Sequence, residues 1–193
     1  MVYLRSGLNG GVFYTVFSYR IILPYGKSLS RSSYFVLLDY GKKMLVNTGV
    51  IESQSDLEAL FNIAGLNFSD LDYVVNMSSC PEHIGLNSII QYRNKKVRFF
   101  APPADIAYIE DTVSQHEERY VPGFYKLVSG NTQGVEGLYR DQLFDLGEEQ
   151  VRVSFNGDEK KERVCLNINK SGIEIYASQV RLSRTCREQL NIY

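Results

Sequence analysis

The stretch of residues 73–85 is the sequence feature that most constrains how this chain can fold. It opens with a short run rich in β-branched residues, 73–77, that predicts a buried strand. The next residues are small, polar or proline, and a helical pattern of apolar residues resumes at Ile84. α/β folds place functional side chains in such loops, because the loop lies at the carboxyl edge of the sheet. We therefore expect a functional site in this loop.

The segments around this stretch predict a mixed α/β domain. Upstream, runs of β-branched and aromatic residues predict strands at 11–23, 33–38 and 43–46. A capping box of Ser55 and Glu58 opens a predicted helix that ends at Gly65. Downstream, the apolar patterns predict a helix at 83–92, a strand at 96–100 and a helix at 104–113. Short strands separated by turn residues then predict an antiparallel meander at 142–146, 151–155, 164–168 and 173–177.

Composition indicates one globular domain spanning residues 1–193, with 44% hydrophobic and 22% charged residues. A net charge of −1 supplies no field that would concentrate nucleic acid or an anionic membrane. No apolar run is long enough to cross a membrane, and the N-terminus lacks the order of a secretion signal. The three cysteines, Cys80, Cys165 and Cys186, are widely spaced, which favours reduced thiols. We therefore expect a cytoplasmic protein.

The central loop resembles that of the metallo-β-lactamase superfamily, where T-H-x-H-x-D-H-x-G stands between a strand and a helix. Met77 falls on the Thr and Gly85 on the Gly of that pattern, and the ligand positions fall on Ser78, Cys80, Glu82 and His83. Upstream, Asn47-Thr48-Gly49 resembles the D-T-G turn of the same family. The resemblance covers roughly residues 11–180. It implies a four-layer αββα sandwich of the α/β (α+β) class, here with a truncated C-terminus.

The resemblance also implies a pair of zinc ions, but this chain lacks the residues to hold them. Such a site draws on about five histidines and two aspartates, whereas the whole sequence contains two histidines, His83 and His116. Asp158 stands near the place of a later histidine ligand, and Gln179 follows the strand that should end in a bridging aspartate. We therefore expect no cofactor and no dinuclear site.

Three other interpretations of the loop remain open. A single zinc or other divalent ion could be held by Cys80, Glu82 and His83, with Asp158 as a further ligand. Alternatively, Cys80 could be a nucleophile that His83 activates. In the third, Ser78 and its neighbours only cap the following helix and bind nothing. His116 lies in a charged run that is typical of a solvated surface.

Taken together, these patterns predict a binding domain rather than an enzyme. Its partner would be a small molecule in the vestigial cleft, another protein, or a second copy of the chain that docks through an exposed strand or tyrosine-rich surface. Nucleic acid and membrane are not indicated. The alternative is a hydrolase of an ester, lactone or thioester, acting through Cys80 and His83 or through one metal ion.

Overall fold

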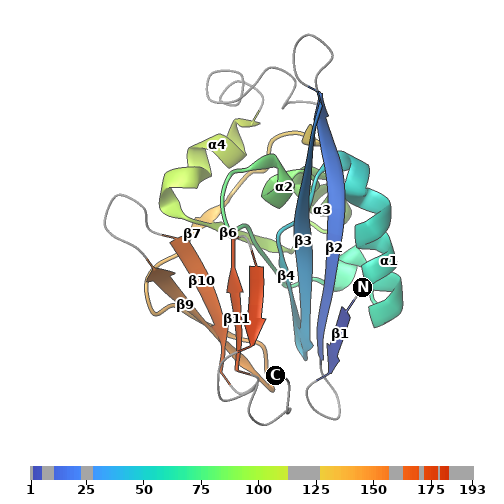
Figure 1. The fold of residues 1–193 in the computed structure, drawn as a ribbon. Coiled ribbons are helices and arrows are strands. Elements are labelled where there is room, and N and C mark those ends of the chain that lie inside the picture. The colour runs from blue at the N-terminus through green and yellow to red at the C-terminus, as the bar shows by residue number, and fades with distance from the viewer. Residues whose placement is uncertain are drawn as a thin grey trace.

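The structure is a computed structural model that describes residues 2–5, 11–22, 28–112, 127–156, 163–169, 172–177 and 179–182. Two β-sheets pack face to face, and short helices cover one of them (Figure 1). No helix in the described part of the chain is long and apolar enough to cross a membrane.

The larger sheet has seven strands in sequence order. They are β1 (Val2–Arg5), β2 (Gly11–Ile22), β3 (Ser28–Tyr40), β4 (Lys42–Val46), β5 (Tyr73–Val75), β6 (Arg98–Ala101) and β7 (Glu136–Gly137). The strands from β1 to β4 are antiparallel, and those from β4 to β7 are parallel. The parallel half brings the carboxyl ends of β4, β5 and β6 to one edge, where the sequence predicted a functional loop.

The smaller sheet has five strands and is antiparallel throughout, which confirms the predicted meander. Its members are β8 (Leu143–Asp145), β9 (Gln150–Asn156), β10 (Arg163–Ile168), β11 (Ile173–Tyr176) and β12 (Gln179–Leu182). The sequence pattern did not predict β12, the two-residue β7, or β1.

The helices in the described part are α1 (Gln54–Ala64), α2 (Pro81–Ile84), α3 (Asn87–Arg93) and α4 (Ile106–Glu110), with 3₁₀ turns at Ile51–Ser53, Phe68–Asp70 and Pro103–Asp105. The C-terminus of α1 is as predicted, because Gly65 adopts a left-handed φ of 70°. The predicted capping box at Ser55 is wrong, since the helix already begins at Gln54. Instead, the Ser53 hydroxyl accepts the Val50 N–H at 3.0 Å.

The helix predicted at 83–92 is interrupted, so α2 and α3 are separate pieces. The break falls at Leu86, whose φ of −104° and ψ of 7° lie outside the helical range. Its N–H donates to Thr48 Oγ1 at 3.3 Å, and a hydrogen bond to the loop after β4 replaces the helical one.

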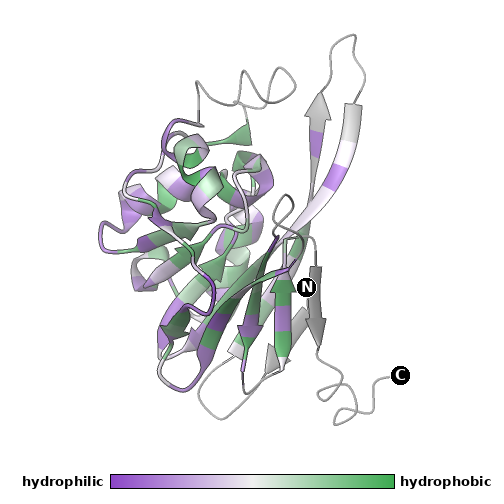
Figure 2. Cartoon of the chain, turned by 90° about the vertical axis from the view of Figure 1, so that its left-hand side faces the viewer, coloured by the Kyte–Doolittle hydropathy of each residue, from purple (hydrophilic) through white to green (hydrophobic). Residues whose placement is uncertain are grey.

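Two hydrophobic clusters share the larger sheet because successive side chains along a strand point to opposite faces. On β3, Phe35 and Leu37 face the helices, whereas Val36 and Leu38 face the smaller sheet. Figure 2 shows hydrophobic and hydrophilic residues alternating along the strands. The helix–sheet–sheet layering of the predicted sandwich is therefore present. No described helix lies on the outer face of the smaller sheet.

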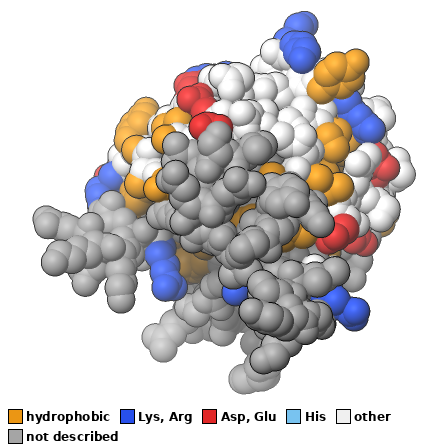
Figure 3. All heavy atoms as spheres, turned by 90° about the horizontal axis from the view of Figure 1, so that it is seen from above, with side chains coloured by type: hydrophobic (Ala, Val, Ile, Leu, Met, Phe, Trp, Pro, Cys, Tyr) orange, Lys and Arg blue, Asp and Glu red, His pale blue; other side chains and the backbone are white. Residues whose placement is uncertain are grey.

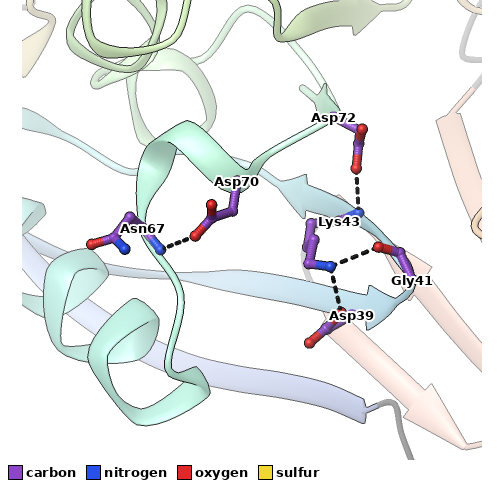
Figure 4. A network of polar contacts seen from close by, with 6 residues as sticks. All are labelled: Asp39, Gly41, Lys43, Asn67, Asp70 and Asp72. Carbon is purple, nitrogen blue, oxygen red and sulfur yellow. Dashed lines mark hydrogen bonds and ion pairs between the residues drawn. The ribbon is translucent and has the colours of Figure 1, made fainter.

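Polar contacts join the start of β4 to its neighbours, at the end of the strand away from the loop after β5 (Figure 4). The Lys43 N–H donates to Asp72 Oδ2 at 2.8 Å, which joins the start of β4 to the residue before β5. The Lys43 ammonium donates to the Gly41 carbonyl at 2.6 Å and lies 3.4 Å from Asp39 Oδ1. These contacts fix the β3–β4 turn far from the candidate site.

Acidic and basic side chains of the described residues are interspersed on the face seen in Figure 3.

Candidate functional site

A cavity of about 710 Å³ lies at the carboxyl edge of β5 and β6, where both sheets contribute walls. Its lining residues are Ser32, Ser33, Tyr34, Met77, Ser78, Glu82, His83, Pro102, Pro103, Ala104, Asp105, Phe155, Arg163, Val164, Tyr176 and Ala177. Strand β5 ends in the loop that carries Ser78, and β6 ends in the turn that carries Asp105. The predicted loop therefore lines the cavity.

Ser78 and His83 form the central contact of this cavity. The Ser78 Oγ lies 2.7 Å from His83 Nδ1. His83 Nε2 lies 3.2 Å from the carbonyl oxygen of Ala177, just after β11. A carbonyl can only accept, so Nε2 carries the hydrogen and the neutral ring has its lone pair at Nδ1. The Ser78 hydroxyl therefore donates to Nδ1.

Burial keeps the His83 ring neutral. Its side chain is 6% exposed, and removal from water lowers the pKa of His83 below its ordinary value. The carboxylates of Glu82 and Asp105 and the Ala177 carbonyl act in the opposite direction, with smaller effects. At neutral pH the ring is therefore an unprotonated base beside a hydroxyl.

The backbone of α2 is held in place by a buried polar network. The carbonyl oxygen of His83 accepts from the Thr48 N–H at 2.9 Å and from Asn76 Nδ2 at 2.6 Å. Asn76 and Asn87 bond each other in both directions, at 3.1 and 2.8 Å, and Thr48 Oγ1 donates to Asn87 Oδ1. Asn47, Thr48, Asn76 and Asn87 are all fully buried. This network fixes the helix that carries His83.

A second pair of contacts shapes the loop. The Cys80 N–H donates to Ser78 Oγ at 3.2 Å, so that oxygen accepts from the backbone while its hydrogen points to His83. The Ser79 hydroxyl donates to Asp105 Oδ1 at 2.5 Å, which ties the loop after β5 to the turn after β6. The loop is thus constrained on both sides of Ser78.

The structure brings Ser78, Glu82 and His83 together in one cavity, as the sequence motif suggested. Cys80 does not line the cavity, and both His83 ring nitrogens are bonded to Ser78 and Ala177 rather than to its thiol. Asp158 and His116 lie outside the described residues, and Gln179 is described only as the first residue of β12.

Sequence reasoning missed several residues of the cavity wall, including Tyr34, Asp105, Arg163 and Tyr176. One signal for the supporting network was available. Asn47 and Asn76 each directly follow a buried strand of the parallel half, and polar residues at that edge meet. Tyr34, Arg163 and Tyr176 gave no comparable signal, because they lie on β3, β10 and β11, strands of two different sheets.

The described residues of the cavity do not include the donors that a pair of zinc ions requires. The described part of the chain holds no group of three or more His, Cys, Asp and Glu side chains that could bind a metal ion. Ser78, at one of the positions that carry zinc ligands in the metallo-β-lactamase motif, offers only a hydroxyl. The only described imidazole, that of His83, uses both ring nitrogens in bonds to protein atoms. The residues present therefore do not fit the zinc pair.

Comparison with solved structures identifies the fold. A metallo-β-lactamase family protein from Thermus thermophilus superposes with a TM-score of 0.60 and 16% identity, covering 83% of this chain and 57% of that one. The metallo-β-lactamase GOB-18 from Elizabethkingia meningoseptica gives 0.58 and 15%, covering 74% and 53%. Metallo-β-lactamase SMB-1 bound to 2-mercaptoethanesulfonate gives 0.55 and 20%, covering 69% and 51%.

These matches confirm the predicted metallo-β-lactamase fold. The chain spans about half the length of the matched structures. No family model matches the sequence, and no curated protein matches it.

Proposed function

We propose that this chain binds a small molecule in the cavity beside Ser78 and His83 and does not use the dinuclear zinc chemistry of metallo-β-lactamases. The observation that carries the proposal is a cavity of about 710 Å³ at the carboxyl edge of β5 and β6, whose described donors do not fit a pair of zinc ions. A fold keeps its scaffold through its core, whereas its function depends on the residues in the site.

The cavity has the size and chemistry of a ligand site. Pockets for small organic molecules are typically about 300–1,000 Å³, apolar in most of their lining, with a few convergent polar groups. Here Phe155, Val164 and the adjacent prolines at 102 and 103 supply apolar walls. Ser78 and His83 supply a hydroxyl and an imidazole at one end. The site therefore combines apolar contact with directional hydrogen bonding.

The charges in the wall favour one class of ligand. Glu82 and Asp105 are carboxylates, and Arg163 is the only cationic side chain among the described lining residues. Two carboxylates beside one guanidinium disfavour a polyanion by like-charge repulsion. We therefore expect a small neutral or zwitterionic molecule with hydrogen-bond donors as well as acceptors.

Ligand-observed NMR with a library of small polar fragments tests the proposal. Ala104 is exposed and lines the cavity, so Ala104→Phe should fill the space without disturbing the core. Ala107 is also exposed but does not line the cavity, and Ala107→Phe is the matched control. Fragments should bind the wild-type protein and Ala107→Phe but not Ala104→Phe. Absence of binding to the wild type, or equal binding to both variants, contradicts the proposal.

A further inference from the structure

We propose that Ser78 is a nucleophile with His83 as its general base, and that the cavity transfers an acyl group from an activated ester or thioester to the Ser78 hydroxyl. The inference rests on the proposed binding of a small molecule in this cavity, and it names the reactive group of that molecule. It also replaces the thiol of Cys80 with the hydroxyl of Ser78 as the reacting group.

The contact between the two side chains has the geometry that nucleophilic catalysis requires. A serine hydroxyl is a weak nucleophile until a base within about 2.6–3.2 Å takes its proton. Ser78 Oγ lies 2.7 Å from His83 Nδ1, and the Ala177 carbonyl bound to Nε2 leaves Nδ1 as the acceptor. The hydroxyl hydrogen is therefore directed at the base before any ligand binds.

The base is oriented by a third group, as in other serine–histidine arrangements. Here that group is the Ala177 carbonyl, which fixes the ring at Nε2. The Thr48 N–H and Asn76 Nδ2 hold the carbonyl of His83 itself. The imidazole is thus fixed at both its ring and its backbone, and such fixed geometry is what positions reacting atoms.

Both reacting side chains are reachable from the cavity. Ser78 is half-buried and lines it together with His83. The Cys80 N–H donates to Ser78 Oγ from the backbone, which leaves a lone pair of that oxygen for attack. Arg163 lines the same cavity, and its positive charge would stabilise the oxyanion that forms at the carbonyl oxygen of the acyl group.

The reaction has two steps that balance. In the first, Ser78 Oγ bonds to the acyl carbon and its proton moves to His83 Nδ1. The bond to the alcohol or thiol breaks, and the leaving oxygen or sulfur takes that proton. In the second, water attacks the Ser78 ester and passes a proton to Nδ1. The carboxylic acid leaves, and Ser78 Oγ regains its hydrogen.

Acylation by p-nitrophenyl acetate tests this inference. We expect a burst of p-nitrophenolate with an amplitude near one equivalent of protein, a mass increase of one acetyl group, and assignment of that group to Ser78 by peptide mapping. Ser78→Ala should reduce the burst to the background level. Ser88→Ala is the matched control, because Ser88 is also half-buried and bonds another side chain, Ser129, at 2.6 Å, but lies outside the cavity.

Two further variants separate the alternatives. His83→Asn should slow acetylation of Ser78 by about 100-fold or more, the usual contribution of a general base. Cys80→Ala should leave the burst unchanged. A burst that survives in Ser78→Ala, or that disappears in Cys80→Ala, overturns the inference. Thermal unfolding of each variant shows whether it is folded.

The fragment-binding and acetylation experiments together separate this inference from the proposed function. If fragments bind the wild-type protein and Ala107→Phe but not Ala104→Phe, and Ser78 is not acetylated, the binding proposal stands. The proposal that Ser78 is a nucleophile is then contradicted. If the wild-type protein neither binds fragments nor is acetylated, both proposals are contradicted.

Discussion

The carbonyl oxygen of Gly49 lies directly against Gly85, and a β-carbon built on Gly85 would be 2.3 Å from that oxygen. The same β-carbon would lie 2.6 Å from the Leu127 carbonyl oxygen and 2.7 Å from Val50 Cα. All three are backbone atoms, which cannot rotate aside as the end of a side chain can. The turn after β4 and the end of α2 therefore approach so closely that only glycine fits at position 85.

Gly85→Ala should destabilise the protein by about 1–3 kcal/mol, the usual cost of overpacking a filled interior. Urea unfolding followed by circular dichroism measures the change. Gly137→Ala is the control, because its β-carbon would lie 3.5 Å from Pro103 Cγ, an ordinary contact distance. Equal midpoints for the two variants would show that the backbone around Gly85 can move apart.

The Asn76–Asn87 pair predicts a second effect on stability. Asn87→Ala removes the Nδ2 donor that bonds the buried Asn76 Oδ1 at 2.8 Å. It also takes one acceptor each from Thr48 Oγ1 and Asn76 Nδ2, which keep the His83 carbonyl as their other acceptor. A buried polar group left without a partner costs about 1–3 kcal/mol, so we expect a loss of free energy of unfolding in that range. Asn62→Ala, on the exposed face of α1, should change the free energy by less than about 0.5 kcal/mol. Chemical denaturation of both variants checks the prediction.

Much of the fold follows from local sequence patterns. Strands β2 to β6 and β8 to β11 could be predicted, because the alternating apolar residues and turn residues that indicate them lie within a few positions of one another. Ser78, Glu82 and His83 could be placed in one site for the same reason, since they share one loop and helix start. The break between α2 and α3 could not be predicted, because it depends on a hydrogen bond from Leu86 to Thr48, far away in the sequence.

The partners of the site residues could not be predicted either. The carbonyl that fixes His83 belongs to Ala177, in the other sheet, and the carboxylate that binds Ser79 belongs to Asp105. These pairings depend on how two sheets and a turn pack, which spacing along the chain does not specify. The sequence therefore indicated the loop and the missing zinc ligands, and not the Ser78–His83 arrangement.

The lowered pKa of His83 predicts a loss of stability in acid. Burial is the largest cause, and Glu82 and Asp105 offset it only in part. Because the folded pKa lies below the unfolded value of about 6.5, the unfolded state binds more protons as the pH falls through that value. The free energy of unfolding should therefore fall from about pH 7 towards the folded pKa, by at most about 1.4 kcal/mol per pH unit from this group.

Urea titrations from about pH 7.5 to about pH 5 on the wild-type protein and on His83→Asn check this dependence. The variant has no group that titrates at position 83, so its stability should vary less across the range. Parallel pH profiles for the two proteins would contradict a neutral, buried imidazole.

The donors of the cavity predict no stabilisation by zinc. Zinc that binds the folded state raises the unfolding temperature, by more the tighter it binds, and a bound pair would do so strongly. Since His83 uses both ring nitrogens in bonds to Ser78 and Ala177, we expect unchanged unfolding temperatures after chelation and after zinc addition. Elemental analysis that finds two zinc ions per chain, removed by a chelator with a loss of stability, would overturn the prediction.

Tyr34 links the two sheets. Its hydroxyl, on β3, donates to the main-chain carbonyl of Tyr176, on β11, and the ring is 3% exposed. Burial raises the pKa of Tyr34 well above its ordinary value, so the phenol keeps its hydrogen for this bond. Tyr34→Phe keeps the ring but leaves the Tyr176 carbonyl without this donor. We expect a loss of about 1–2 kcal/mol in the free energy of unfolding.

Tyr92→Phe is the matched control for this prediction, since Tyr92 is 79% exposed and its substitution should have little effect. Because Tyr34 and Tyr176 both line the cavity, losing the bond should also loosen the wall between the sheets. Hydrogen exchange measured by mass spectrometry should then show faster exchange in β11 of Tyr34→Phe than of Tyr92→Phe. Equal exchange together with equal stability would mean that the Tyr34 hydroxyl does not help to hold the two sheets together at the site.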